Sequence, residues 1–375
     1  MKDDVFIVGD EAITPLGLGS QLNFEHILDG YTAVAKISDL QLADQSIYAA
    51  RIDEAHWVDN IKDGHRYTRL EKLFILVLAS LIAEYQIPLD ERTLVVLATT
   101  KGNVSLLHNP LRAFAEERVH LSTMANEIQR HFGFKNQIIP ISNACISGSL
   151  AISVARRLLQ YDTRYKRAIV IGGDELSKFI VSGFHAFQAL ADEHCRPFDR
   201  DRKGLNLGEA VAAVYLSKIP TNDSVRIAGV GSHNDANHIS GPSRTGEGLY
   251  QSIQEAMQEA GEPALDFISA HGTATPYNDE MEAIALQRSG LSTTPLHSLK
   301  AYYGHTLGAS GLLETILGIH SLKNNRLIPS RGFMHQGTSQ RLNMITNSTQ
   351  LPLNSFLKTA SGFGGCNIAT IFQKV

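Results

Sequence analysis

The sequence contains little cysteine, and its cysteines lie far apart. Only three of the 375 residues are cysteines, namely Cys145, Cys195 and Cys366, and no Cys-x-x-Cys pair occurs. This spacing does not suit a disulfide framework or a cysteine zinc site, so we expect no metal and a reducing compartment. The first residues also lack the layout of a secretory signal peptide, which favours a cytoplasmic location.

Long hydrophobic runs, low-complexity segments and a strong excess of one charge are absent as well. No apolar stretch reaches the about 18 residues that a spanning helix requires, so no membrane span is expected. The formal net charge of −4 argues against binding nucleic acid through bulk charge. The 43% hydrophobic content allows a large core, in two domains or in one duplicated domain.

Strand-like and helix-like segments alternate along the chain. Apolar segments typical of strands occur at residues 5–8, 94–98, 138–141, 168–171 and 208–216. Helical patterns occur between them, at residues 21–29, 73–85, 110–131 and from 150 onwards. The second part repeats this alternation, with strands expected at 225–230, 267–270, 295–299, 354–360 and 367–372. Because several strands are apolar without interruption, we predict an α/β fold whose sheets are buried on both faces.

Two segments in different halves of the chain share one plan. Cys145 lies among small residues between an apolar strand and a long helical pattern, and His305 lies in a similar small-residue turn before another apolar helix. This similarity suggests an internal duplication. At the start of a helix, the positive end of the helix dipole favours the thiolate form of a cysteine, so Cys145 is a candidate nucleophile.

Four candidate sites each follow a strand: Cys145, His271, the pair Lys300 and His305, and the loop 362–365. Ligands of α/β folds gather at the carboxyl ends of strands. A cysteine and two histidines there can perform acyl transfer, with backbone N–H groups of a glycine-rich loop holding the oxyanion.

Each element taken alone also has a purely structural explanation. A buried cysteine is more often a packing residue, and a single histidine is usually a satisfied polar group. Lys300 also fits an ion pair with Asp279 or Glu314.

The motifs are specific when they are taken together, and they occur in a fixed order. They are Asn143-Ala144-Cys145-x-Ser147-Gly148, His271-Gly272-Thr273-x-Thr275-Pro276-x-x-Asp279, Lys300-x-x-x-Gly304-His305-x-x-Gly308-Ala309-x-Gly311-x-x-Glu314 and Gly362-Phe363-Gly364-Gly365-x-Asn367. This set resembles the β-ketoacyl-[acyl-carrier-protein] synthases of the elongating Cys-His-His type, and the resemblance covers essentially the whole chain.

The resemblance implies a thiolase-like αβαβα sandwich of two similar halves, residues 1–220 and 221–375, that is usually dimeric. It implies the nucleophile Cys145, the active-site residues His271, His305 and Lys300, and oxyanion-hole amides at Cys145 and Phe363. Substrate contacts are implied for Thr273 and Thr275, which match hydroxyls that bind a phosphopantetheine arm, and for Ile146, Phe363 and Gly364. Glu314 or Asp279 is the implied counterion of Lys300. Carrier-protein docking is implied for Arg66, Arg69 and Lys72, although a solvated basic face is the simpler reading of such a cluster.

The implied reaction is a decarboxylative Claisen condensation. Cys145 takes an acyl chain from acyl carrier protein, and malonyl-carrier protein then loses CO₂ while His271 and His305 stabilise the enolate. Attack on the acyl thioester yields a β-ketoacyl product in fatty-acid, polyene or polyketide-type elongation. No cofactor is bound, because the substrates arrive on the phosphopantetheine arm of the carrier protein.

The sequence departs from the family in two ways. It is short ahead of Cys145 and between Cys145 and His271, where the family lines its acyl pocket and dimer interface, and it has branched Ile146 where a small polar residue is common. The class of acyl chain and the choice between a homodimer and a heterodimer with a related ketosynthase-like subunit stay open.

The motifs also leave room for alternative functions. A non-catalytic chain-length or partner subunit usually lacks the cysteine. A thiolase or a Cys-His-Asn priming synthase lacks the second histidine, here His305. A thioester hydrolase would need a positioned water and a general base.

Overall fold

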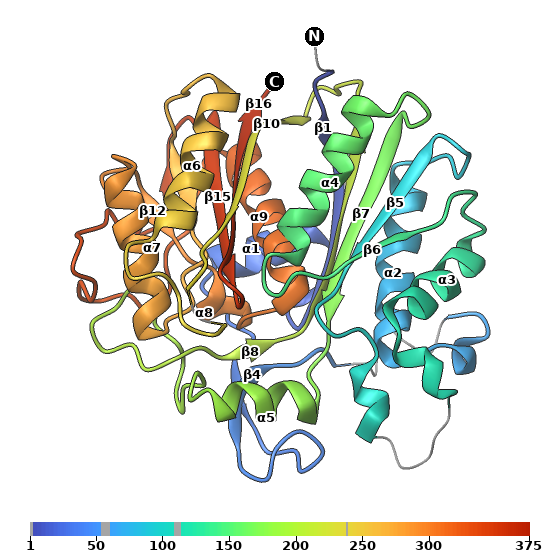
Figure 1. Cartoon of the computed structure of the whole chain (residues 1–375), viewed down its shortest axis with the longest axis horizontal. Helices are drawn as coiled ribbons and strands as arrows, with labels where there is room; N and C mark the ends of the chain where they lie inside the picture. The colour runs from blue at the N-terminus through green and yellow to red at the C-terminus, as the bar shows by residue number, and fades with distance from the viewer. Residues whose placement is uncertain (1–2, 54–60, 109–113, 238) are drawn as a thin grey trace.

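The computed structural model describes residues 3–375 except 54–60, 109–113 and 238 (Figure 1). The strands of the N-terminal half are β1 (Phe6–Thr14), β2 (Gly17–Leu18), β3 (Ala35–Ile37), β4 (Ile47–Ala50), β5 (Thr93–Ala98), β6 (Ile139–Ile141), β7 (Arg167–Asp174), β8 (Leu207–Gly208) and β9 (Ala210–Ser217). Those of the C-terminal half are β10 (Val225–Asn234), β11 (Phe267–Ser269), β12 (Leu296–His297), β13 (Arg326–Leu327), β14 (Thr349–Gln350), β15 (Ser355–Gly362) and β16 (Cys366–Lys374). The predicted boundary at residue 220 falls between β9 and β10.

The helices complete the alternation expected from the sequence. They are α1 (Ser20–Leu28), α2 (Arg69–Glu84), α3 (Leu121–Phe132), α4 (Ser147–Tyr161), α5 (Lys178–Ala186), α6 (Glu247–Ala260), α7 (Pro276–Arg288), α8 (Lys300–Tyr303) and α9 (Ser310–Asn324). None of these helices is long and apolar enough to cross a membrane.

The two halves build sheets of the same topology. One sheet runs β6-β5-β7-β9-β1 and the other β12-β11-β15-β16-β10. If the five strands of each sheet are numbered 1 to 5 along the chain, both sheets have the spatial order 3-2-4-5-1. The first three strands of each order are parallel and the remaining pairings are antiparallel. A short antiparallel pairing of β1 with β10, Phe6 opposite Arg226, joins the sheets at one edge. This repeated order supports the predicted duplication.

Helices cover both faces of both sheets, as Figure 1 shows. Successive residues of β5 face different cores: Leu94 and Val96 pack in the central core with α4 and α9, while Val95 and Leu97 pack under α2 and α3. A third core lies between the C-terminal sheet and helices α6 and α7. Because side chains alternate along a strand, a strand buried on both faces must be apolar throughout. The predicted αβαβα sandwich is confirmed.

The middle layer is formed by α4 and α9, which approach each other closely at two glycines. A Cβ atom on Gly148 would lie 2.7 Å from the carbonyl oxygen of Gly308, and one on Gly311 would lie 2.7 Å from the backbone nitrogen of Ser149. Real Cβ atoms do not approach so closely, so only glycine fits at either position. The contact brings the N-termini of the two helices together, and with them the segments that carry Cys145 and His305.

Helix boundaries differ from the prediction in three places. The helix predicted over 110–131 is wrong in its first part, because α3 begins only at Leu121 and two 3₁₀ helices, Val104–His108 and Glu116–Val119, precede it; residues 109–113 lie outside the described residues. Helix α4 begins at Ser147, three residues before the predicted pattern. Helix α2 begins at Arg69, four residues before the predicted pattern, and a capping box opens it, with the Thr68 hydroxyl accepting from the Glu71 N–H.

Candidate active site

Cys145 lies in the turn between β6 and α4. Its neighbour Ala144 has φ +46°, a left-handed conformation that is unusual for a residue with a side chain and that clusters at functional sites. The Ser147 hydroxyl stabilises the turn, donating to the Ala144 carbonyl at 2.6 Å and accepting from the Asn143 N–H at 2.8 Å. Cys145 is 7% exposed and is one of the residues that line a cavity.

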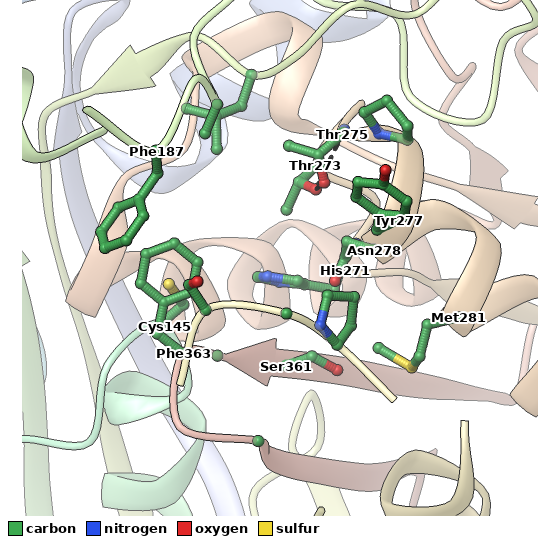
Figure 2. Close-up of a pocket in the computed structure, with 18 of the residues that line it drawn as sticks. Cys145, Phe187, His271, Thr273, Thr275, Tyr277, Asn278, Met281, Ser361 and Phe363 are labelled. Atoms are coloured by element: carbon green, nitrogen blue, oxygen red, sulfur yellow. Dashed lines mark hydrogen bonds between the residues drawn. The ribbon is translucent and has the colours of Figure 1, made fainter. Parts of the chain in front are cut away.

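This cavity has a volume of about 300 Å³ and is lined by both halves of the chain. Cys145 comes from the first half, and the second half contributes the predicted site residues that line it: His271, His305, Thr273, Thr275, Phe363 and Gly364. Figure 2 shows the imidazole of His271 pointing across the cavity toward Cys145 and Phe363. The cavity therefore brings Cys145 together with both predicted histidines, whereas Lys300, which was also predicted as catalytic, does not line it.

The two histidines lie against each other, with ring centroids 5.3 Å apart. The N–H of Leu307 donates to Nδ1 of His305 at 3.3 Å, so the ring proton of a neutral His305 is on Nε2. That Nε2 is buried and has no partner within the described residues. Burial and Lys300 lower the pKa of His305 to about 3, and the same causes hold the pKa of His271 well below its ordinary value. Both imidazoles are therefore neutral near pH 7, and that of His305 has an N–H free to donate.

A buried ion cluster lies beside the histidines. Lys300 pairs with Oε1 of Glu314, and a second lysine, Lys358, pairs with Oε2 at 2.6 Å. Although burial opposes ionisation, the two cations lower the pKa of Glu314 to about 2. Of the two counterions expected for Lys300, Glu314 is the one that contacts it, and Lys358 was not anticipated from the sequence.

Asp279 has a different task from the expected one. It accepts from the backbone N–H groups of Thr273 at 2.9 Å and Phe198 at 2.7 Å, and so holds the loop after β11. Burial raises its pKa to about 6. Thr273 and Thr275 extend from this loop, their hydroxyl oxygens 2.9 Å apart at the cavity wall (Figure 2).

The loop between β15 and β16 packs directly on the cysteine. A Cβ atom on Gly362 would lie 3.0 Å from the backbone nitrogen of Cys145, so a larger residue would crowd that amide. Gly364 and Gly365, with φ of +89° and +80°, form the tight turn. The N–H groups of Cys145 and Phe363 have no acceptor among the residues that the structure describes. They are available to a ligand oxygen.

Two aromatic residues that the sequence did not reveal hold Phe363. Phe184 stacks on its ring at a centroid distance of 5.7 Å, and Phe187 meets it edge-on at 5.2 Å. Both come from α5 and its C-terminal cap, and they carry no recognisable motif. Phe187 is 53% exposed at the cavity rim (Figure 2).

Two expectations for the site are wrong. We expected a thiolate at Cys145, but burial raises the pKa of its thiol to about 12, so the thiol form prevails in the free site. We also expected Ile146 to contact substrate, but its side chain is 1% exposed, packs in the central core and does not line the cavity.

The three residues predicted for carrier docking behave differently from one another. Arg66 is exposed and Lys72 is half-buried. Arg69 points inward, where its guanidinium bonds both carboxylate oxygens of Glu209 at 2.8 Å. The docking prediction for Arg69 is therefore wrong, because its charge is already used inside the protein.

Together, a doubled α/β sandwich and a cysteine facing two histidines define a thiolase-fold enzyme of the condensing, acyl-transferring class. Comparison with family models makes this specific. Residues 2–221 match the N-terminal domain of β-ketoacyl synthases and residues 225–334 match their C-terminal domain. The chain belongs to the β-ketoacyl synthase family, which confirms the prediction made from the motifs.

Individual relatives agree with the family match. The chain is 26% identical over 407 residues to a 3-oxoacyl-[acyl-carrier-protein] synthase 2 of Staphylococcus aureus, with 99% of this chain and 98% of the relative covered. A β-ketoacyl synthase structure from Burkholderia phymatum matches with a TM-score of 0.88, 26% identity and full coverage of both chains. A chain of the ketosynthase–chain length factor complex from Xenorhabdus doucetiae matches in fold with a TM-score of 0.92 at 24% identity, covering 100% of this chain and 98% of that one.

Proposed function

We propose that this protein catalyses the decarboxylative condensation of a malonyl group with an acyl group held on Cys145, both delivered by acyl carrier protein. The observation that carries the proposal is the cavity in which Cys145 meets two neutral, buried histidines. The curated relatives named 3-oxoacyl-[acyl-carrier-protein] synthase support the substrate class.

In the first step, Cys145 exchanges with the thioester of an acyl-carrier protein. The sulfur bonds to the acyl carbon, the pantetheine sulfur leaves, and the thiol proton of Cys145 balances the leaving thiolate. The exchange therefore needs no net proton, which fits a buried thiol of raised pKa. The N–H groups of Cys145 and Phe363 are placed to hold the oxyanion of the tetrahedral intermediate.

In the second step, the malonyl thioester oxygen binds between His271 and His305. As the carboxylate leaves as CO₂, its electron pair forms an enolate, and N–H donation from the two neutral imidazoles stabilises the negative oxygen. A single donor of this kind contributes roughly 3 kcal/mol. The enolate carbon then attacks the acyl carbon, and Cys145 leaves as a thiolate that takes up a proton.

The arm that carries each substrate reaches this site through the cavity. Thr273 and Thr275 present hydroxyls to it, and Gly364 leaves room for it beside Phe363. Exposed Arg66 and half-buried Lys72 are the remaining candidates for contact with an acidic carrier protein.

We further propose that the chain works as a dimer, with itself or with a related subunit. Structural neighbours solved as ketosynthase–chain length factor complexes support this arrangement. A cytoplasmic location belongs to the same proposal and is supported by the unpaired state of the three cysteines.

Intact-protein mass spectrometry tests the proposal. We expect a single acyl adduct after incubation with an acyl-carrier thioester, no adduct on Cys145→Ala, and an unchanged adduct on the control Cys195→Ala, whose thiol is buried away from the cavity. Addition of malonyl-carrier protein should then yield a β-ketoacyl product. Free acid without elongation would instead identify a hydrolase, and no adduct at all would identify a non-catalytic partner subunit.

A further inference from the structure

Lys358 is a buried lysine that neither the motifs nor the proposed reaction assign. It lies in β15, opposite Ser269 in the parallel pairing with β11, and is 1% exposed. Its ammonium group donates to the carbonyls of Thr359 at 2.7 Å and Ser269 at 3.1 Å, and approaches that of Ala270 at 3.4 Å. Burial of an ammonium group is costly unless it is paired, so this placement calls for an explanation.

The carbonyls of Ser269 and Ala270 immediately precede His271. The other side of this backbone is held as well, because Glu282 accepts from the N–H groups of His271 at 2.9 Å and Gly272 at 2.8 Å. Lys358 therefore binds the backbone carbonyls just before His271, and Glu282 binds the backbone N–H groups of His271 and Gly272. These hydrogen bonds on both sides of the backbone leave His271 little freedom to shift.

Lys358 also reaches the second histidine through the ion cluster. Its ion pair with Glu314, at 2.6 Å, connects it to Lys300, which stands beside His305. One side chain therefore touches both the backbone that carries His271 and the carboxylate that anchors Lys300.

We propose that Lys358 is a positioning residue that fixes His271 and His305 as one unit, an inference that rests on the function proposed above. With both rings set at one spacing, a single enolate oxygen can receive two hydrogen bonds. A misplacement of about 1 Å in such a site can cost about a hundredfold in rate.

Charge acts in the same direction as geometry. Lys358 lowers the pKa of both histidines and so helps to keep them neutral. The charged groups around the two rings are Lys300 of α8, Glu314 of α9, Lys358 of β15 and Glu282 of α7. Removing Lys358 subtracts one cation from this set, so the histidines should take up protons at a higher pH.

The test measures acyl loading of Cys145 and malonyl decarboxylation separately in Lys358→Met, with Lys374→Met as a control. Lys374 ends the neighbouring strand β16 and bonds Asn325, away from the cavity. We expect decarboxylation by Lys358→Met to fall at least about tenfold in kcat, with its acid limb moved to higher pH, while acyl loading changes less than about threefold. Equal decarboxylation and an equal pH profile in the two variants would overturn the inference.

Two further measurements keep the inference open to refutation. If Lys358→Met does not fold, Lys358→Arg replaces it: the charge is kept but the compact ammonium geometry is lost, so decarboxylation should fall while the acid limb stays in place, and full activity would overturn the inference. Titration of the histidine rings by NMR needs no turnover. If wild-type protein neither loads nor decarboxylates, the proposed function fails, whereas an unchanged histidine titration in Lys358→Met, with wild-type protein active, defeats the role of Lys358 alone.

Discussion

In the N-terminal half, α4 begins at Ser147 and is preceded by Ala144 and Cys145; in the C-terminal half, α9 begins at Ser310 and is preceded by Leu307 and Gly308. Ala144 and Leu307 both have left-handed backbones, with φ of +46° and +52°. The duplicated topology thus repeats the same turn at the same place. Where one half has Cys145, the proposed nucleophile, the other has Gly308.

The two copies of the turn have acquired complementary chemistry. The glycine at 308 removes a side chain from the place where the other half presents sulfur, and His305, three residues earlier, faces the shared cavity instead. The fifth residue of each helix differs in the same sense, being apolar Ala151 in α4 and charged Glu314 in α9. In the proposed reaction, one half supplies a small neutral nucleophile, and the other supplies the hydrogen-bond donors and the charges that support them.

The strongest way to break this division of labour is to remove the donors of the C-terminal half. We expect His305→Ala and His271→Ala each to lower malonyl decarboxylation by about a hundredfold or more, because one oxyanion donor is worth that much. Acyl loading of Cys145 should persist, since it uses the N-terminal half and the loop amides. A CO₂-release assay beside intact mass spectrometry checks both points. Full decarboxylation in both variants would remove the histidines from the enolate site.

Crowding the contact between the two central helices should have the next largest effect. Gly311→Ala places a methyl group against Ser149, which forces α4 and α9 apart and should cost about 1–3 kcal/mol of unfolding free energy. Condensation should fall more than stability alone explains, because Cys145 and His305 separate. Gly133→Ala is a useful control for stability, since its Cβ would meet nothing within 4 Å although its φ of +69° adds local strain. Denaturant unfolding measures the loss of stability, and condensation rates measure the additional loss of activity. A Gly311→Ala variant with full activity and unchanged stability would contradict the close contact between α4 and α9.

The two halves differ in the connection between their last two strands, and a substitution of Phe187 tests the importance of that difference. The N-terminal half joins β7 to β9 by a long segment with α5, whereas the C-terminal half joins β15 to β16 by a tight glycine turn. Phe187 of the long segment rests on Phe363 of the short one. We expect Phe187→Ala to change KM for the acyl-carrier substrate several-fold with little change in the unfolding free energy, because an edge-on aromatic contact is worth only about 0.5–1.5 kcal/mol. An unchanged KM would mean that Phe363 keeps its position unaided.

The smallest expected effect concerns the basic residues around the start of α2, Arg66 and Arg69, in the N-terminal half. Arg66→Glu should weaken carrier binding a few-fold, and more at low salt than at high salt, because exposed charges are screened. Arg69→Glu should instead destabilise the protein, since it would bring a third carboxylate to Glu175 and Glu209. Binding measured at two ionic strengths, together with thermal unfolding, separates the two variants. If Arg66→Glu bound the carrier as tightly as the wild type at both ionic strengths, Arg66 would be a solvated surface residue with no role in docking.

Much of the fold and the identity of the site could be predicted from the sequence. Continuous apolar strands imply sheets covered on both faces, and a thiol, two histidines and a glycine loop placed after strands imply one site. The motifs predicted the site correctly because each reflects a local structural requirement. The small residues around Cys145, for example, let α4 pack closely against α9.

Other features depend on tertiary contacts that leave no local pattern. Lys358 lies in a strand otherwise made of small and apolar residues, and only the fold shows that Glu314 and the end of β11 surround it. Phe187 looks like an ordinary surface aromatic until the β15–β16 turn is placed beneath it. Arg69 was misjudged because the sequence does not show that Glu209, 140 positions away, reaches it. The pKa of Cys145 was misjudged because burial raises it, and the sequence does not show how completely the fold covers that thiol.

In the proposed reaction, the cavity at Cys145 also sets the order in which the two carriers bind. Ile146 packs in the central core and does not line this cavity, whereas Phe363 does. In the proposed reaction both carrier arms use this cavity of about 300 Å³ as their passage, so the first carrier must depart before the second can enter. Steady-state rates should therefore follow ping-pong kinetics, and an excess of either carrier should inhibit turnover by occupying the passage out of turn.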